Sequence, residues 1–260
     1  MRMIVCNVWG GRIFEPLMQF INEEKEKTDI FLFQEIYSTH SETKEWFDSK
    51  LNLPVRVNLL AELSSALSGF EAYSSPSQDK AIAWTTITDF DVEFGLTGFV
   101  KRGIDVRGSG EIFVLRQRNA RTGDASTEGK NLQFFAIEQA GRHYTVCNFH
   151  GIWTGQGKGD APDRILQSTN IRKFLDQIKG PKILAGDFNL LPGTDSLKII
   201  EEGMVNLITK YGITDTRGAL YTKPLRFADY MLVSPDVTVK SFAVPKVAIS
   251  DHLPMIVEFE

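Results

Sequence analysis

The sequence has few cysteines and no apolar segment long enough to cross a membrane. Its 260 residues include two cysteines, Cys6 and Cys147, each inside a short apolar run. Free cysteine is among the most buried residue types, so we expect two buried, reduced thiols. No run reaches the roughly 18 apolar residues of a membrane span, and the first run, residues 3–9, is too short for a secretory leader. We therefore expect a soluble, cytoplasmic protein that does not act on a membrane.

The sequence also lacks an excess of positive charge. It carries 29 Lys and Arg against 33 Asp and Glu, a formal net charge of −4. A protein that binds nucleic acid tightly and non-specifically is normally basic, so the net charge argues against such binding. It does not exclude a local strip of basic residues. A cluster of carboxylates around a metal ion would itself make a sequence acidic.

No repeat, low-complexity segment or Pro/Gly/Ser-rich linker divides the chain. We therefore expect a single domain over residues 1–260. The stretch 64–79 is rich in Ser, and 123–130 is polar with two glycines; both are predicted to be surface loops.

Short apolar runs are numerous, and helical spacing is rare. Helical spacing predicts helices over residues 13–21, 165–178 and 195–202. The runs predicted as strands are residues 3–9, 30–34, 81–86, 96–100, 111–117, 132–138, 144–150, 182–188, 227–234, 237–244 and 255–259. Many strands and few helices favour two sheets packed face to face, with helices outside.

Polar residues interrupt or end these apolar runs. Taken singly, a strand-end Asp or Asn is usually a turn former, a strand-end Glu is usually solvated, and a lone His is usually not a ligand. As a set they are harder to explain as turns, because burying carboxylates costs several kcal/mol unless a cation or hydrogen bonds compensate. The set is Asn7, Glu35, Asn148, His150, Asp187, Asn189, Asp229, Asp251 and His252.

If these strand ends converge, they form one polar pocket at the end of a rigid β-sandwich. Oxygen ligands without a cysteine cluster favour Mg²⁺ or Mn²⁺ over structural zinc, and Mg²⁺ leaves coordination places for phosphate oxygens. The pattern therefore points to hydrolysis of a phosphate ester. Asp187 and Asn189 stand two residues apart after a buried strand, so an extended chain would aim both at the same phosphate.

The motifs together resemble a known family. The matching pieces are VCNVWG, FLFQEIY, VCNFHGIW, ILAGDFNLLP, RFADYMLVS and ISDHLPMIV. In this order they resemble the endonuclease/exonuclease/phosphatase family, whose fold is shared by deoxyribonuclease I, abasic-site endonucleases, sphingomyelinases and inositol-polyphosphate 5-phosphatases. The resemblance implies a four-layer α/β-sandwich, with two central, mostly antiparallel sheets and helices outside. It also implies a phosphoesterase that depends on Mg²⁺ or Mn²⁺.

The resemblance further implies the metal-binding residues. Glu35 would be the main metal ligand, and Asn7 would help to hold Glu35 and the metal. Asp251 would be a second metal carboxylate, acting directly or through water.

The resemblance implies catalytic roles as well. Asp187 would orient or deprotonate the attacking water, and Asn189 would donate to the phosphate. His252 would bind the phosphate oxygen or stabilise its developing charge, held in one tautomer by Asp229. His150 would be a second phosphate-facing imidazole or an acid for the leaving group.

The family indicates the reaction type but not the substrate. Arg102 resembles a residue of nuclease-like members, Trp153 is a core residue or a pocket wall, and Arg226 stands one residue further from Asp229-Tyr230 than the family pattern has it. These three residues are the predicted substrate contacts. We expect a nuclease for DNA or RNA. The alternative is a phosphatase or phosphodiesterase for a nucleotide, inositol phosphate or phospholipid headgroup, and a non-catalytic binding module is less favoured. A monomer is expected.

Overall fold

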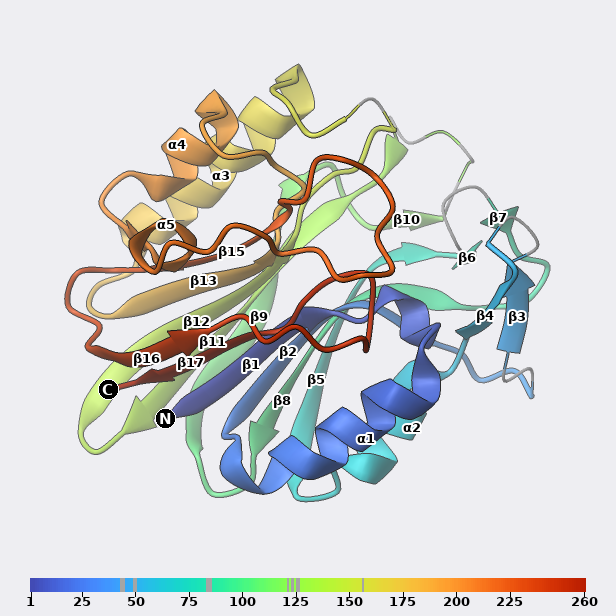
Figure 1. The fold of residues 1–260 in the computed structure, drawn as a ribbon, viewed down its shortest axis with the longest axis horizontal. Coiled ribbons are helices and arrows are strands. Elements are labelled where there is room, and N and C mark those ends of the chain that lie inside the picture. The colour runs from blue at the N-terminus through green and yellow to red at the C-terminus, as the bar shows by residue number, and fades with distance from the viewer. Residues whose placement is uncertain are drawn as a thin grey trace.

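Two large β-sheets pack face to face, and helices cover the outer face of each, in four layers (Figure 1). This computed structural model describes residues 1–42, 45–48, 51–82, 86–120, 122, 124, 127–155 and 157–260. The arrangement confirms the expected four-layer α/β-sandwich.

The first sheet has seven strands within the described residues. Its two central strands, β1 and β2, are parallel, and β8 and β17 pair antiparallel beside them. In spatial order the strands are β10 (Asn119–Ala120), β5 (Phe70–Asp79), β8 (Glu93–Lys101), β2 (Ile30–Ser38), β1 (Arg2–Asn7), β17 (Met255–Phe259) and β16 (Val239–Ala243).

The second sheet has six strands within the same ranges. Only β12 and β13 pair in parallel, and the other neighbours are antiparallel. In spatial order the strands are β14 (Val205–Asn206), β15 (Asp229–Val233), β13 (Lys182–Asp187), β12 (Arg142–His150), β11 (Lys130–Gln139) and β9 (Asp105–Leu115).

The remaining elements are short ribbons and helices. Figure 1 places α1 and α2 on the outer face of the first sheet and α3, α4 and α5 on that of the second. The helices are α1 (Phe14–Glu24), α2 (Leu59–Ala66), α3 (Pro162–Gln177), α4 (Asp195–Glu201) and α5 (Leu207–Lys210), with 3₁₀ turns η1 (Trp9–Gly11) and η2 (Lys25–Lys27). The ribbons are β3 (Glu45–Asp48) with β4 (Leu53–Arg56), and β6 (Ala81–Ile82) with β7 (Thr86–Ile87).

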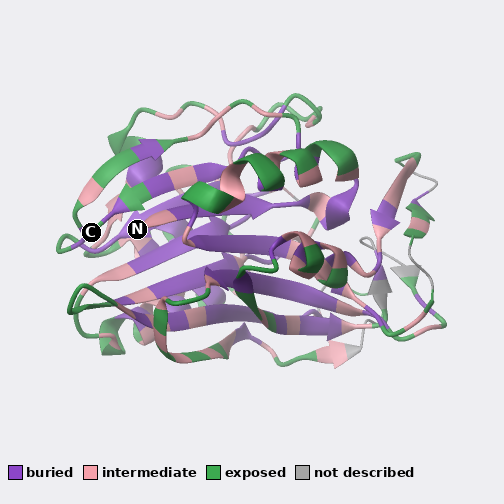
Figure 2. Ribbon diagram, turned by 90° about the horizontal axis from the view of Figure 1, so that it is seen from below, coloured by how far each residue is buried: buried purple, intermediate pink, exposed green. Residues whose placement is uncertain are grey.

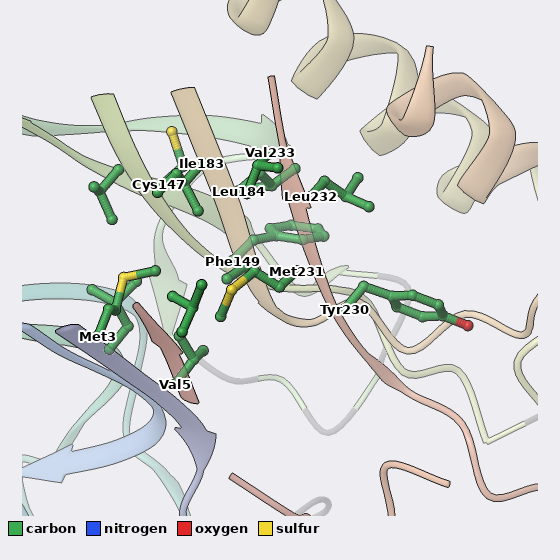
Figure 3. Close-up of a cluster of buried hydrophobic side chains, with 14 of the residues drawn as sticks. Met3, Val5, Cys147, Phe149, Ile183, Leu184, Tyr230, Met231, Leu232 and Val233 are labelled. Carbon is green, nitrogen blue, oxygen red and sulfur yellow. The ribbon is translucent and has the colours of Figure 1, made fainter. Parts of the chain in front are cut away.

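The main hydrophobic core lies between the two sheets. Figure 3 shows part of it, where Met3 and Val5 of β1 approach Phe149 of β12 and Met231 of β15. The central strands of both sheets are buried along most of their length, while the outer helix faces and many loops are exposed (Figure 2). Both thiols are buried and free, as expected. In the described residues, no helix has the length and apolar character needed to span a bilayer.

Most of the expected elements are present, and one is not. The three predicted helices correspond to α1, α3 and α4, and α4 begins after Thr194, whose side chain accepts a hydrogen bond from the Leu197 N–H. The predicted loop over 64–79 is wrong, because residues 70–79 form β5, a strand paired with β8. Part of the predicted strand 81–86 and of the predicted loop 123–130 lies outside the described residues.

Candidate active site

Polar residues from distant parts of the sequence gather at one end of the two sheets. In the second sheet His150 is the register partner of Asp187, and Asp187 is that of Asp229, so three strand ends lie in one row. A cavity of about 540 Å³ opens at this end. The predicted site residues that line the cavity are Glu35, His150, Trp153, Asp187, Asn189, Asp251 and His252.

The turn after β13 sets the positions of Asp187 and Asn189. Gly186 has a φ of +141°, and a Cβ there would lie 2.0 Å from the Phe149 carbonyl oxygen, so glycine is required. Asn189 has a φ of +52°, its N–H donates to Asp187 Oδ1 over 2.9 Å, and its side-chain amide donates to the Gly151 carbonyl over 3.2 Å. The expected extended segment is therefore wrong. A tight turn, rather than strand alternation, brings both side chains to the cavity.

Glu35 stands at an irregularity in β2. The register with β8 shifts between Gln34 and Ile36, and Glu35 itself has a φ of +62°. The Asn7 amide donates to Glu35 Oε1 over 2.9 Å and to Asp187 Oδ2 over 3.0 Å, so it holds two carboxylates together. Burial raises the pKa of Glu35, and the Asn7 hydrogen bond opposes that rise.

Asp229 and His252 form a buried pair. Nδ1 of His252 lies 2.8 Å and 3.0 Å from the two Asp229 carboxylate oxygens, so it donates to them. Nε2 is left for the cavity and lies 3.4 Å from Asp187 Oδ2. Burial and a nearby guanidinium lower the pKa of His252, but the surrounding carboxylates outweigh both and raise it above its ordinary value. The imidazole therefore favours the cationic form.

His150 is the second imidazole of the site. Its Nε2 lies 3.7 Å from Asp187 Oδ2 and 3.9 Å from Glu35 Oε1. Burial, together with the nearby Lys130 ammonium, lowers the pKa of His150 to about 3. The pKa values of the two histidines are thus shifted in opposite directions, because the carboxylates around His252 outweigh its burial and burial dominates at His150.

The donor set fits a divalent cation. Asp251 Oδ1 is buried and has no hydrogen-bond partner among the described residues, and Glu35 lines the same cavity. Asp187, Asp229 and His252 also place ligand atoms within 4.8 Å of one another. Asp229 and His252, however, are hydrogen-bonded to each other. Glu35 and Asp251 are therefore better candidates for the oxygen ligands of a cation than Asp229 is. Such carboxylates favour Mg²⁺ or Mn²⁺.

The cavity has aromatic, cationic and apolar walls. Trp153 and Tyr221 line it, and Lys223 Nζ lies 5.1 Å from the centroid of the Trp153 ring. Trp153 is therefore a pocket wall rather than a core residue. Leu51 and Leu53, at the β3–β4 ribbon, line it too, so this ribbon forms part of the cavity wall.

Two of the predicted substrate contacts, Arg226 and Arg102, do not line the cavity. Arg226 donates to Asp215 and to the carbonyls of Tyr221, Arg217 and Gly218, so it braces the loop before β15. Its guanidinium is engaged by that loop and does not line the cavity.

Arg102 lies at the far end of the first sheet. It follows the end of β8, where Val100 pairs with Ile30 at the start of β2, whereas Glu35 is near the other end of that strand. Arg102 lines a separate cavity of about 180 Å³ with Glu71. The nuclease-like segment is therefore not beside the candidate active site.

The sequence analysis missed Arg217. This buried residue lines the cavity, and its Nη1 donates to Asp251 Oδ2 over 2.9 Å. It forms an isolated bridge with His252, 35 positions along the chain. No motif or element was predicted around it, so only the folded chain brings it to the site.

Comparison with known proteins supports the resemblance. A family profile described as the Endonuclease/Exonuclease/phosphatase family matches residues 4–252. No match was found among curated proteins.

Solved structures share the fold. An endonuclease/exonuclease/phosphatase family protein from Leptotrichia buccalis aligns over 100% of this chain and 99% of its own, with 19% identity and a TM-score of 0.71. A mannosyl-6-phosphatase from Bacteroides thetaiotaomicron aligns over 100% and 99%, with 16% identity and a TM-score of 0.69. TDP2 from D. rerio, complexed with a single-strand DNA product, aligns over 100% and 98%, with 12% identity and a TM-score of 0.68. These likenesses establish the fold alone.

Proposed function

The chain belongs to the endonuclease/exonuclease/phosphatase family, and on that basis we propose that it is a divalent-metal-dependent phosphoester hydrolase. The observation that carries the proposal is the convergence of Glu35, Asp187, Asp251 and His252 on one cavity. Acids and an imidazole from three separate segments would not share one cavity for a merely structural reason, because their desolvation is costly.

Glu35 and Asp251 would hold the metal, with Asn7 positioning Glu35 through its amide. A bound divalent cation would neutralise charge on the phosphate oxygens and lower the pKa of a bound water.

Asp187 would orient the attacking water. Burial raises its pKa, but the nearby histidines and cations lower it more, so the carboxylate stays ionised. Its Oδ1 accepts from the Asn189 backbone N–H, which holds Asn189 beside the carboxylate. One N–H of the Asn189 amide donates to the Gly151 carbonyl, and the other would donate to the phosphate.

The histidines would act on the phosphate oxygens. His252 presents Nε2 as a charged donor, because Asp229 holds Nδ1. His150 is neutral, so it serves better as a second phosphate-facing donor than as an acid for the leaving group. Donors fixed in this way stabilise charge that develops in the transition state.

For the substrate we favour a small phosphoester. The cavity of about 540 Å³ is in the range of small-molecule sites, and its walls stand on several sides. The net charge of −4 weighs against a long polyanion. The basic residue that favoured a nuclease, Arg102, lies elsewhere.

A nuclease is the second candidate. Trp153 and Tyr221 line the cavity with Lys223, and aromatic and cationic side chains together suit the bases and phosphates of a single strand. D. rerio TDP2 was crystallised with a single-strand DNA product.

The test is a substrate panel. Purified protein is assayed with Mg²⁺ and with Mn²⁺ on aryl phosphomonoesters and phosphodiesters, nucleotides, sugar phosphates and short single-stranded oligonucleotides. We expect turnover that EDTA abolishes and that Asp187→Asn lowers by at least about 10²-fold. Asp176→Asn, on the exposed face of α3, is the matched control and keeps full activity.

Salt separates the two substrate classes. Oligonucleotide cleavage that depends on many phosphate contacts falls steeply between 50 and 200 mM salt, on the order of 10³-fold for six contacts. Hydrolysis of a small ester changes little. No turnover on any ester with either metal would overturn the proposal.

A further inference from the structure

Arg217 is held rigidly at the edge of the cavity. Its Nη1 donates to Asp251 Oδ2 over 2.9 Å, and its guanidinium carbon lies 4.2 Å from the centroid of the Tyr221 ring. The side chain is 8% exposed. An anion on one side and an aromatic face on another leave the guanidinium little freedom.

This guanidinium has hydrogen-bonding capacity that the protein does not use. Among the described residues, neither Nε nor Nη2 of Arg217 has a hydrogen-bond acceptor. Nε is buried, whereas Nη2 is not fully buried. A buried donor without an acceptor destabilises the fold. Arg217 lines the same cavity as Glu35 and His252, so its guanidinium has unused donors at the wall of the candidate active site.

Two structural roles would explain Arg217 without a ligand. One is to brace its loop, but Arg226 does that, donating to the carbonyls of Arg217, Gly218 and Tyr221. The other is to neutralise Asp251, but that uses only Nη1. The pair still leaves Asp251 Oδ1 without a donor and Arg217 with spare N–H groups. An unmet acceptor suits a cation, and an unmet donor beside it suits an anion.

We propose that Arg217 contacts the substrate, and that Nη2 donates to a non-bridging phosphate oxygen beside the imidazole of His252. The inference rests on the proposed function and extends it. A planar guanidinium fits phosphate oxygens better than an ammonium does.

The test measures binding of inorganic phosphate by calorimetry in the presence of Mg²⁺, for which turnover is not needed. We expect Arg217→Gln to weaken phosphate binding by about tenfold or more, since a charged hydrogen bond is lost. Arg217→Lys keeps the charge beside Asp251 and loses the planar fork, so we expect a smaller loss. Arg172→Gln, which removes an ion-paired arginine from α3, leaves phosphate affinity unchanged.

The variants also separate the competing roles. If Arg217 only neutralises Asp251, phosphate affinity in both Arg217 variants stays within twofold of wild type while Mg²⁺ affinity changes, and the proposal falls. If Arg217→Gln does not fold, Arg217→Lys decides in the same way. If the Arg217 variants bind phosphate more weakly but the wild-type protein hydrolyses no ester, the proposed function is contradicted and the Arg217 contact is supported. If the wild-type protein hydrolyses an ester but the Arg217 variants bind phosphate as wild type does, the function is supported and the Arg217 contact is contradicted.

Discussion

Lys158 is a buried lysine close to the acidic site. It is 3% exposed, its Nζ donates to the Phe227 carbonyl over 2.9 Å, and it lies 5.3 Å from the centroid of the Tyr221 ring. Burial, followed by repulsion from Arg217, lowers the pKa of Lys158 from 10.5 to about 8. Folding therefore works against the ammonium form.

This shift predicts a pH-dependent stability. Between pH 8 and 10.5 the unfolded chain keeps a proton that folded Lys158 has lost, so the free energy of unfolding rises with pH. We expect wild type to gain about 3 kcal/mol relative to Lys158→Met across this range, measured by urea unfolding at a series of pH values. Lys223→Met, at an exposed lysine, corrects for the general loss of a positive charge. A Lys158→Met difference that did not vary with pH would contradict the shift.

At the residue scale, sequence patterns identified the strand-end residues that line the cavity, but they did not show which arginines lie there. Asp187 and His252 were predictable because polar groups that end apolar strands stand out in the sequence. Arg217, Arg226 and Arg102 have long side chains whose partners are set by tertiary contacts. Asp251, for example, is 34 positions from Arg217. Nothing local distinguishes a loop brace from a phosphate ligand.

At the element scale, a ladder of buried amides joins the two sheets. Gln34 of β2 donates to Asn148 of β12 over 2.6 Å, and Asn148 donates to Gln133 of β11 over 3.2 Å. Gln133 then donates back to the first sheet, to the Tyr73 carbonyl and to Ser75 Oγ of β5. Asn148 therefore belongs to this ladder, between the sheets.

Breaking the ladder should cost stability. Gln133→Leu keeps the side-chain size but removes the donor to the Tyr73 carbonyl and one of the two acceptors of the Asn148 amide. We expect the free energy of unfolding to fall by about 2–4 kcal/mol. Gln139→Leu, the same change at an exposed position of β11, should stay within about 0.5 kcal/mol. Urea unfolding compares the two. Equal losses would mean that the amides contribute nothing specific.

The same ladder explains why β5 was not predicted. Ser75 and Ser77 of β5 are buried, although serine clusters usually mark loops. The backbone of β5 pairs with β8, and the side-chain amides of Asn131 and Gln133 donate hydrogen bonds to Ser75. These partners come from other elements, so the sequence of β5 alone does not reveal them. The apolar strands, in contrast, carry their own signal, because their side chains alone require burial.

At the scale of the whole molecule, the fold brings several carboxylates together at one end. Basic side chains contact two of the converging carboxylates, with His252 on Asp229 and Arg217 on Asp251. Glu35 meets a neutral amide, and burial followed by repulsion from Asp251 and Asp187 raises its pKa. The folded protein therefore carries a local repulsion that a bound divalent cation would relieve.

This imbalance predicts that Mg²⁺ stabilises the folded protein. A ligand at 100 times its Kd adds about 2.7 kcal/mol, and each kcal/mol moves the Tm of a chain of this size by about 2–4 °C, so thermal unfolding should rise by several degrees with Mg²⁺. Glu35→Gln should abolish that rise and leave the metal-free Tm equal or higher, because it removes a buried, repelled charge. Glu15→Gln, on the exposed face of α1, should keep the full rise. A Glu35→Gln protein that Mg²⁺ still stabilised as in wild type would place the cation away from Glu35.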